Sequence, residues 1–167
     1  MDLVSSTSAT APILGVVRKV VLLDAPSNLG LRPPVPGTVP GCYKLAGALR
    51  DQRLLERLSA IEGGVVVPPR YDRGDWNEGD GVFNAHAIAD STRRLADRLG
   101  GHLWAGEFPV VLGGDCSILL GSMLALRRMG RYGLAFIDGH SGTLAIPATA
   151  GATPPGWAPP QARTLPW

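Results

Sequence analysis

The stretch VVLGGDCSILLG, residues 110–121, decides the fold class together with LAFIDGHSG, residues 134–142. In each stretch an apolar run ends in a short polar group that contains Asp and Ser with either Cys or His. A run that is apolar on both faces is typical of a strand buried in a parallel sheet. Ligands collect at the carboxyl ends of the strands in such sheets, so these two polar groups form the candidate site.

The same alternation of strands and helices extends through the preceding residues. Predicted strands lie at residues 20–23, 62–67, 108–114 and 132–138, the second of them stopped by Pro68 and Pro69. Predicted helices lie at residues 43–61, 82–99 and 116–129, the last ended by Gly130. Alternating strands and helices imply a parallel sheet with helices on both faces. The sequence therefore predicts a three-layer α/β fold with a mainly parallel sheet of about four strands.

Composition divides the chain into three regions and excludes some functions. Residues 1–12 are rich in Ser, Thr and Ala and are expected to be flexible, residues 13–142 form the patterned domain, and residues 143–167 form an irregular Pro/Ala/Gly-rich tail. The formal charge is +2 and no basic cluster occurs, which argues against nucleic acid as a partner. No apolar run is long enough to span a membrane.

The two cysteines favour a reducing compartment. Cys42 and Cys116 are not part of a CxxC pair, and both are interpreted as thiols. The amino terminus has no basic segment of the kind that opens a secretory signal. A cytoplasmic location is the expectation.

Three residues at the predicted strand ends could hold a metal ion. Asp138 and His140 are separated by one residue and therefore point the same way from the strand that ends there. A carboxylate and an imidazole so placed can share a divalent metal, with Cys116 as a third ligand. Structural roles are the alternatives: Cys116 as a small buried side chain, and Asp115 and Asp24 as caps of a helix and a loop.

Two other functions remain open from the residues alone. Cys116 could act as the nucleophile of a hydrolase, with His140 as its base and Asp115 or Asp138 orienting the imidazole. The chain could also be a non-catalytic part of an α/β domain whose exposed sheet edge associates with itself.

The motifs resemble those of a known family. PVVLGGDCSILLG followed by AFIDGHS is similar to the ureohydrolase family of arginases and agmatinases, whose signatures are Gly-Gly-Asp-His-Ser and then Asp-Ala-His-x-Asp. LLDAPSNLGLRPPVPG followed by LAGAL resembles the first strand, loop and helix of that family. The resemblance covers about residues 18–141 and corresponds to the amino-terminal half of a ureohydrolase.

The resemblance implies an arginase-like fold and a metal-dependent reaction. Family members bind two Mn²⁺ ions and hydrolyse a C–N bond of a small guanidino or amidine substrate, releasing urea or a related product, and they are commonly homo-oligomers. It implies that Asp138 is the bridging carboxylate, that His140 is a ligand of one ion, and that Cys116 stands in place of the histidine that binds the other. Neither motif assigns a catalytic or substrate-binding residue.

The chain departs from the family pattern at two positions. Cys116 offers a soft thiolate, which favours Zn²⁺ over Mn²⁺, and Gly142 replaces the second aspartate of the second motif. The family's later Asp-x-Asp pair has no counterpart in the acid-free tail. These departures predict a truncated, catalytically incomplete ureohydrolase. The abrupt change of composition suggests the hypothesis that the reading frame changes at Gly142.

Overall fold

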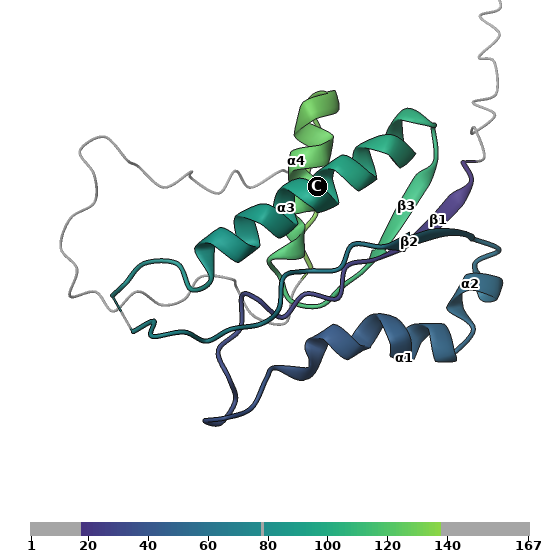
Figure 1. Ribbon diagram of the computed structural model, residues 1–167. Coiled ribbons are helices and arrows are strands. Elements are labelled where there is room, and N and C mark those ends of the chain that lie inside the picture. Colours follow the sequence, from purple (N-terminus) through teal and green to yellow (C-terminus); the bar gives the residue numbers. More distant parts are fainter. Residues whose placement is uncertain (1–17, 78, 138–167) are drawn as a thin grey trace, which may run out of the picture. The chain divides into compact units, whose positions relative to one another are not determined.

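A parallel sheet of three strands forms the centre of the protein (Figure 1). The computed structural model describes residues 18–77 and 79–137. The strands are β1 (Val20–Asp24), β2 (Ile61–Val65) and β3 (Phe108–Leu112), in the order β2-β1-β3. Both neighbours of β1 run parallel to it, which confirms the predicted parallel sheet.

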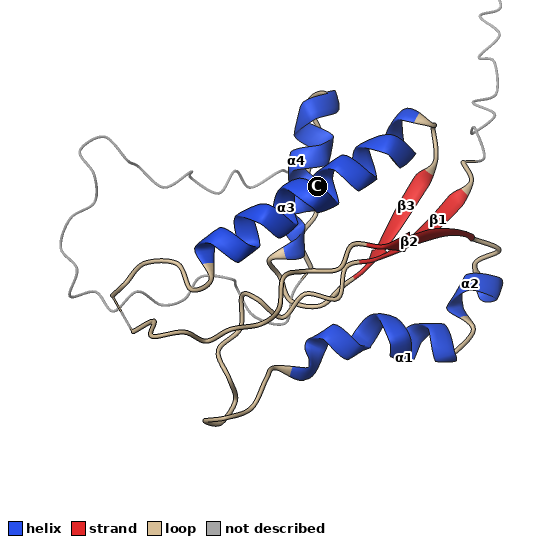
Figure 2. Cartoon of the chain, in the orientation of Figure 1, coloured by secondary structure: helices blue, strands red, loops and turns tan. Residues whose placement is uncertain are grey.

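The helices lie between and after the strands (Figure 2). They are the 3-10 helix η1 (Gly41–Lys44), α1 (Leu45–Asp51), α2 (Leu54–Arg57), α3 (Ala85–Trp104) and α4 (Ile118–Met129). Within the described residues, no helix has both the length and the apolar character needed to cross a membrane.

Adjacent residues of β1 pack against helices on opposite faces of the sheet. Leu22 belongs to a cluster with Ala46 of α1, whereas Leu23 belongs to a cluster with Ala96 of α3 and Ala125 of α4. Successive side chains of a strand point to opposite faces, so one strand supplies both cores. Figure 1 shows α1 and α2 on one side of the sheet and α3 and α4 on the other, which confirms the three layers.

The helix expected over residues 43–61 is wrong in its bounds. The segment is divided into η1, α1 and α2, and Ile61 already belongs to β2. Arg53 and Ser59 have φ angles of +58° and +48°, which a right-handed helix does not accommodate. These two turns return the chain to the sheet, where Ile61 pairs with β1.

The other two helices are confirmed with shifted bounds. The helix expected at residues 82–99 is α3, which begins later and extends to Trp104. The helix expected at residues 116–129 is α4, which begins at Ile118 and ends before Gly130 as predicted. The strand β2 ends at Val65, before the expected stop at Pro68.

The chain divides into two units, residues 1–132 and 133–167. The described part of the predicted fourth strand, residues 132–137, has no strand structure, so that prediction is wrong over these residues. Leu134, Phe136 and Ile137 are exposed. An apolar run becomes a strand only where a neighbouring strand pairs with it and its side chains are covered.

Candidate functional site

The candidate site lies where the loops after β1 and β3 meet. The backbone N–H of Asp115 donates to the carbonyl oxygen of Ser27 at 3.0 Å. A Cβ atom added to Gly114 would lie 1.9 Å from that same oxygen, so only glycine fits. The glycine pair after β3 therefore allows the two loops to approach each other at the carboxyl ends of their strands.

Asp115 joins the two loops through both of its carboxylate oxygens. Its side chain is buried, and Oδ2 accepts the backbone N–H of Gly30 at 2.7 Å and the hydroxyl of Ser27 at 3.4 Å. Oδ1 accepts the backbone N–H of Ser117 at 2.9 Å and also its hydroxyl. The expected role as N-cap of the helix is wrong in position, because α4 begins at Ile118 with Ser117 as its N-cap.

Both cysteines belong to this region of the fold. Cys116 directly follows Asp115 and is exposed, so its interpretation as a buried apolar side chain is wrong. The half-buried thiol of Cys42 donates to the carbonyl oxygen of Ser27 at 3.4 Å. Burial raises the pKa of Cys42, and the charges of Asp115 and Cys116 act in the same direction. No sequence signal placed Cys42 here, because its approach depends on the loop after β1.

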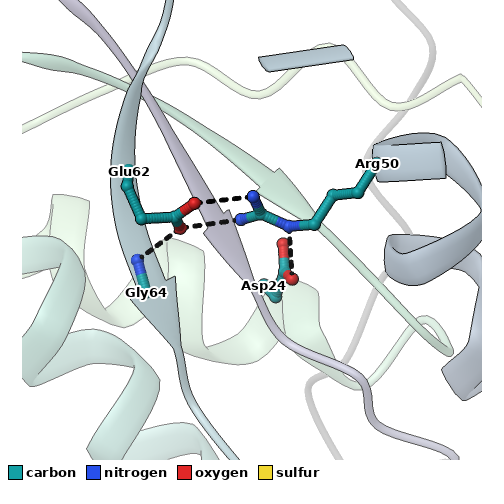
Figure 3. Close-up of polar contacts among 4 residues, drawn as sticks. All are labelled: Asp24, Arg50, Glu62 and Gly64. Atoms are coloured by element: carbon teal, nitrogen blue, oxygen red, sulfur yellow. Dashed lines mark hydrogen bonds and ion pairs between the residues drawn. The ribbon is translucent and has the colours of Figure 1, made fainter. Parts of the chain in front are cut away.

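Asp24 at the end of β1 belongs to a separate charged cluster (Figure 3). Arg50 Nε donates to Asp24 Oδ2 at 2.7 Å, while Nη1 and Nη2 donate to Glu62 Oε2 and Oε1 at 2.7 and 2.8 Å. Glu62 Oε1 also accepts the backbone N–H of Gly64 at 2.9 Å. The guanidinium lowers the pKa of Glu62, and the two carboxylates raise the pKa of Arg50.

The cluster connects α1 to two strands. Arg50 lies on α1, Asp24 on β1 and Glu62 on β2. The expected loop cap at Asp24 is therefore wrong: its carboxylate is one partner of an ion pair. Its other oxygen, Oδ1, is buried and has no hydrogen-bond partner in the described part of the chain.

The described residues do not by themselves fit a metal pair. Asp138 and His140 lie outside the described residues, so Cys116 is the described member of the predicted ligand set. Within residues 18–77 and 79–137, no group of three or more His, Cys, Asp or Glu side chains is arranged to hold a metal ion. Both oxygens of Asp115 are already engaged with the loops.

The family model described as the Arginase family matches residues 19–153. The chain belongs to this family. The match includes both strand-end motifs and confirms the resemblance found in the sequence.

Curated relatives of the chain include two kinds of enzyme. The arginase of Staphylococcus aureus strain COL is 28% identical over 131 residues, which are 78% of this chain and 43% of the relative. The formimidoylglutamase of Aeromonas hydrophila subsp. hydrophila is 41% identical over 98 residues, which are 56% of this chain and 30% of the relative. The chain thus spans less than half the length of these relatives.

Solved arginase structures share the fold. Bacillus caldovelox arginase is 25% identical with a TM-score of 0.56, and the match covers 67% of this chain and 37% of that structure. A Bacillus subtilis arginase is 21% identical with a TM-score of 0.53, covering 67% and 34% respectively. These similarities confirm the α/β fold predicted from the alternation of strands and helices, and the arginase-like fold that the resemblance implied.

Proposed function

We propose that this arginase-family chain contributes to hydrolysis of a C–N bond in a small guanidino or amidine compound. The observation that carries the proposal is the joining of the β1 and β3 loops by Asp115, immediately before Cys116. The resemblance assigns Cys116 to the position of a metal-binding histidine. Its neighbour Asp115 is buried and hydrogen-bonded through both carboxylate oxygens, which fixes the backbone next to that position.

We also propose that the 167 residues alone are catalytically incomplete. In the family the Mn²⁺ pair supplies activated water for attack on a guanidinium carbon, which is a poor electrophile. Here Gly142 provides no ligand, and the described residues do not complete a metal site. The proposal assigns Asp138, His140 and Cys116 to a partial site that does not hold two ions tightly.

Calorimetric titration of the whole chain with Mn²⁺ tests this proposal. We expect no pair of tight sites and no release of urea from arginine or agmatine, and no hydrolysis of formimidoylglutamate. Two tight Mn²⁺ sites together with hydrolysis of any of these substrates would contradict the proposal that the chain alone is catalytically incomplete.

Substitution of Cys116 tests whether this residue occupies the position of the family's metal-binding histidine. Cys116→His restores the ligand type of the family, and we expect about tenfold tighter Mn²⁺ binding than in the wild type, because imidazole suits Mn²⁺ better than thiolate does. Cys116→Ser is the matched control and is expected to show no such gain. Equal affinities of the two variants would contradict the assigned position of Cys116.

The exposed thiol supports a second candidate, a hydrolase with Cys116 as the nucleophile. Iodoacetamide labelling near neutral pH distinguishes it, with the half-buried Cys42 as an internal comparison. A labelling rate of Cys116 that is typical of an unactivated thiol supports the metal-dependent proposal. A much faster rate that falls in His140→Ala supports the nucleophile.

A third candidate is a non-catalytic, self-associating chain. Phe108 of β3 is 53% exposed, and on its other side β3 has no neighbouring strand among the described residues. Such an edge can pair with another copy. Size-exclusion chromatography with light scattering measures the oligomeric state of the chain, and a monomer would contradict this third candidate.

A further inference from the structure

A cavity of about 520 Å³ lies between the loop that follows β1 and the loop that follows β2. Arg32 and the proline-rich segment 33–37 line it from the first loop, and Arg73, Trp76 and Phe83 line it from the second. Its walls therefore combine two guanidinium groups with apolar and aromatic surface. Ligand pockets commonly have this composition, a mostly apolar lining with a few placed charges.

Hydrogen bonds hold the two loops against each other. The hydroxyl of Tyr71 donates to the carbonyl oxygen of Leu31 at 2.9 Å. The side-chain amide of Asn84 donates to the carbonyl oxygen of Leu29, also at 2.9 Å. Each bond joins residues more than 35 positions apart in the sequence. The cavity is formed before a ligand arrives, so binding does not have to order its walls.

The aromatic wall is fixed as well. Trp76 packs edge-on against Phe83 with ring centroids 5.5 Å apart, and its Nε1 donates to the carbonyl oxygen of Gly81 at 3.1 Å. The guanidinium of Arg32 lies over the Trp76 ring, 4.6 Å from the centroid. A guanidinium stacked in this way keeps its edge N–H groups available for a carboxylate.

Among the described residues, no carboxylate forms an ion pair with either cavity arginine. Within residues 18–77 and 79–137 the ion pairs of arginine involve Arg50, Arg94 and Arg128, and not Arg32 or Arg73. Arg73 Nη1 instead donates to an uncharged acceptor, the carbonyl oxygen of Gly74, at 3.3 Å.

The acidic residues nearby serve other contacts. Asp72, Asp75 and Asp80 line a neighbouring cavity and not this one, although Arg73 and Trp76 line both. Asp72 accepts the backbone N–H of Gly74 at 2.9 Å, and Asp80 accepts that of Asn77 at 2.8 Å. The lining of the first cavity therefore has two positive groups and, among the described residues, no negative one.

We propose that this cavity binds a short aliphatic dicarboxylate. Planar guanidinium groups match carboxylates with paired N–H donors, so Arg32 and Arg73 supply the two charges. The segment 33–37 and Phe83 cover the methylene groups between the carboxylates. This site involves no C–N hydrolysis and does not depend on the function proposed above.

Titration of the whole chain with glutarate, by calorimetry and by tryptophan fluorescence, tests the site. We expect saturable binding that weakens about tenfold in Arg32→Gln and in Arg73→Gln, because each loses a charge-assisted pair. Arg93→Gln, an exposed arginine of α3 away from the cavity, is the matched control and keeps the wild-type affinity. Trp76→Phe is expected to remove the fluorescence response while glutarate still binds.

Two comparison ligands determine the ligand class. Neutral glutaramide is expected not to bind, and inorganic phosphate is expected to bind more weakly than glutarate because it leaves the apolar walls uncovered. Glutarate affinity unchanged in both cavity variants would overturn the site, as would a lack of saturation up to about 10 mM glutarate. Phosphate binding tighter than glutarate would overturn the assignment to a dicarboxylate. Unchanged circular dichroism of the variants shows that a lost affinity reflects the cavity and not the fold.

Discussion

Two carboxylates near the ends of neighbouring strands are held in different ways. Asp24, at the end of β1, pairs with the charged guanidinium of Arg50 and leaves one buried oxygen without a partner among the described residues. Asp115, after β3, is surrounded by uncharged donors from two loops, which engage both oxygens. The first joins a helix to the sheet, and the second holds the loops that carry the candidate site.

The comparison indicates which contacts tolerate change. An ion pair formed by a long, flexible side chain can rearrange after a substitution. A carboxylate enclosed by backbone N–H groups cannot, because its donors are fixed by the backbone. We therefore expect substitutions around Asp115 to cost more than substitutions around Asp24.

The largest effect is expected for Gly114→Ala. The new Cβ would overlap the backbone of Ser27, which cannot move without separating the loops, so we expect a loss of about 3 kcal/mol in the free energy of unfolding. Gly113→Ala is the matched control: its Cβ meets the terminal Cδ1 of Ile118 at 2.2 Å, and that flexible side chain can turn away. Urea denaturation measures both. Equal losses in the two variants would contradict the close approach of the loops.

Asp115→Ala is expected to cost about 2 to 3 kcal/mol, because the backbone N–H of Gly30 and the hydroxyl of Ser27 lose a buried acceptor. The same denaturation experiment measures this loss. Ser117→Ala removes a donor and leaves the carboxylate its other contacts, so it should cost about 1 kcal/mol. A smaller loss in Asp115→Ala than in Ser117→Ala would show that the carboxylate does not hold the loops.

Arg50→Gln is expected to cost about 2 kcal/mol, since it leaves the half-buried Asp24 carboxylate without its positive partner. Thermal unfolding checks this value. Arg57→Gln, an exposed arginine of the neighbouring helix α2, is the control and should change stability by no more than about 0.5 kcal/mol. If both variants unfold at the same temperature as the wild type, the charged cluster contributes nothing to the stability of the fold.

The smallest effect is expected for Glu62→Gln, about 0.5 kcal/mol at neutral pH, because this carboxylate is exposed. Arg50 lowers the pKa of Glu62 in the folded state below its ordinary value of 4.5. A carboxyl with a lowered folded pKa stabilises the protein above its unfolded pKa, and this contribution is lost as pH falls through the folded pKa. The difference between wild type and Glu62→Gln should therefore shrink below pH 4.5. A difference that stays constant down to low pH would rule out this contribution.

Much of the fold could be predicted from short apolar patterns. The run at residues 20–23 predicted a buried strand, and β1 is the central strand with Leu22 and Leu23 fully buried. The strand at Phe108–Leu112 and the end of α4 before Gly130 were also predicted. These features depend on neighbouring residues, so a local pattern reports them reliably.

The errors in prediction involve competition between local pattern and tertiary pairing. An apolar stripe over residues 43–61 favoured one helix, but pairing of Ile61 with β1 requires the chain to turn earlier. The apolar run at residues 132–137 favoured a strand, but its side chains are exposed and no strand forms there. The predicted metal ligands Asp138 and His140 lie outside the described residues and stay predictions.

The sequence by itself determined the α/β class, the buried strand at residues 20–23, the glycine pair and the family, because each depends on short motifs and on their order along the chain. Only the tertiary structure decided that Arg50 joins Asp24 to Glu62 and that Arg32 stacks on Trp76. It also decided that Asp115 is close enough for its charge to raise the pKa of Cys42. These partners are 12 to 73 positions apart in the sequence. Contacts at that separation depend on strand register and loop path, which no local periodicity encodes.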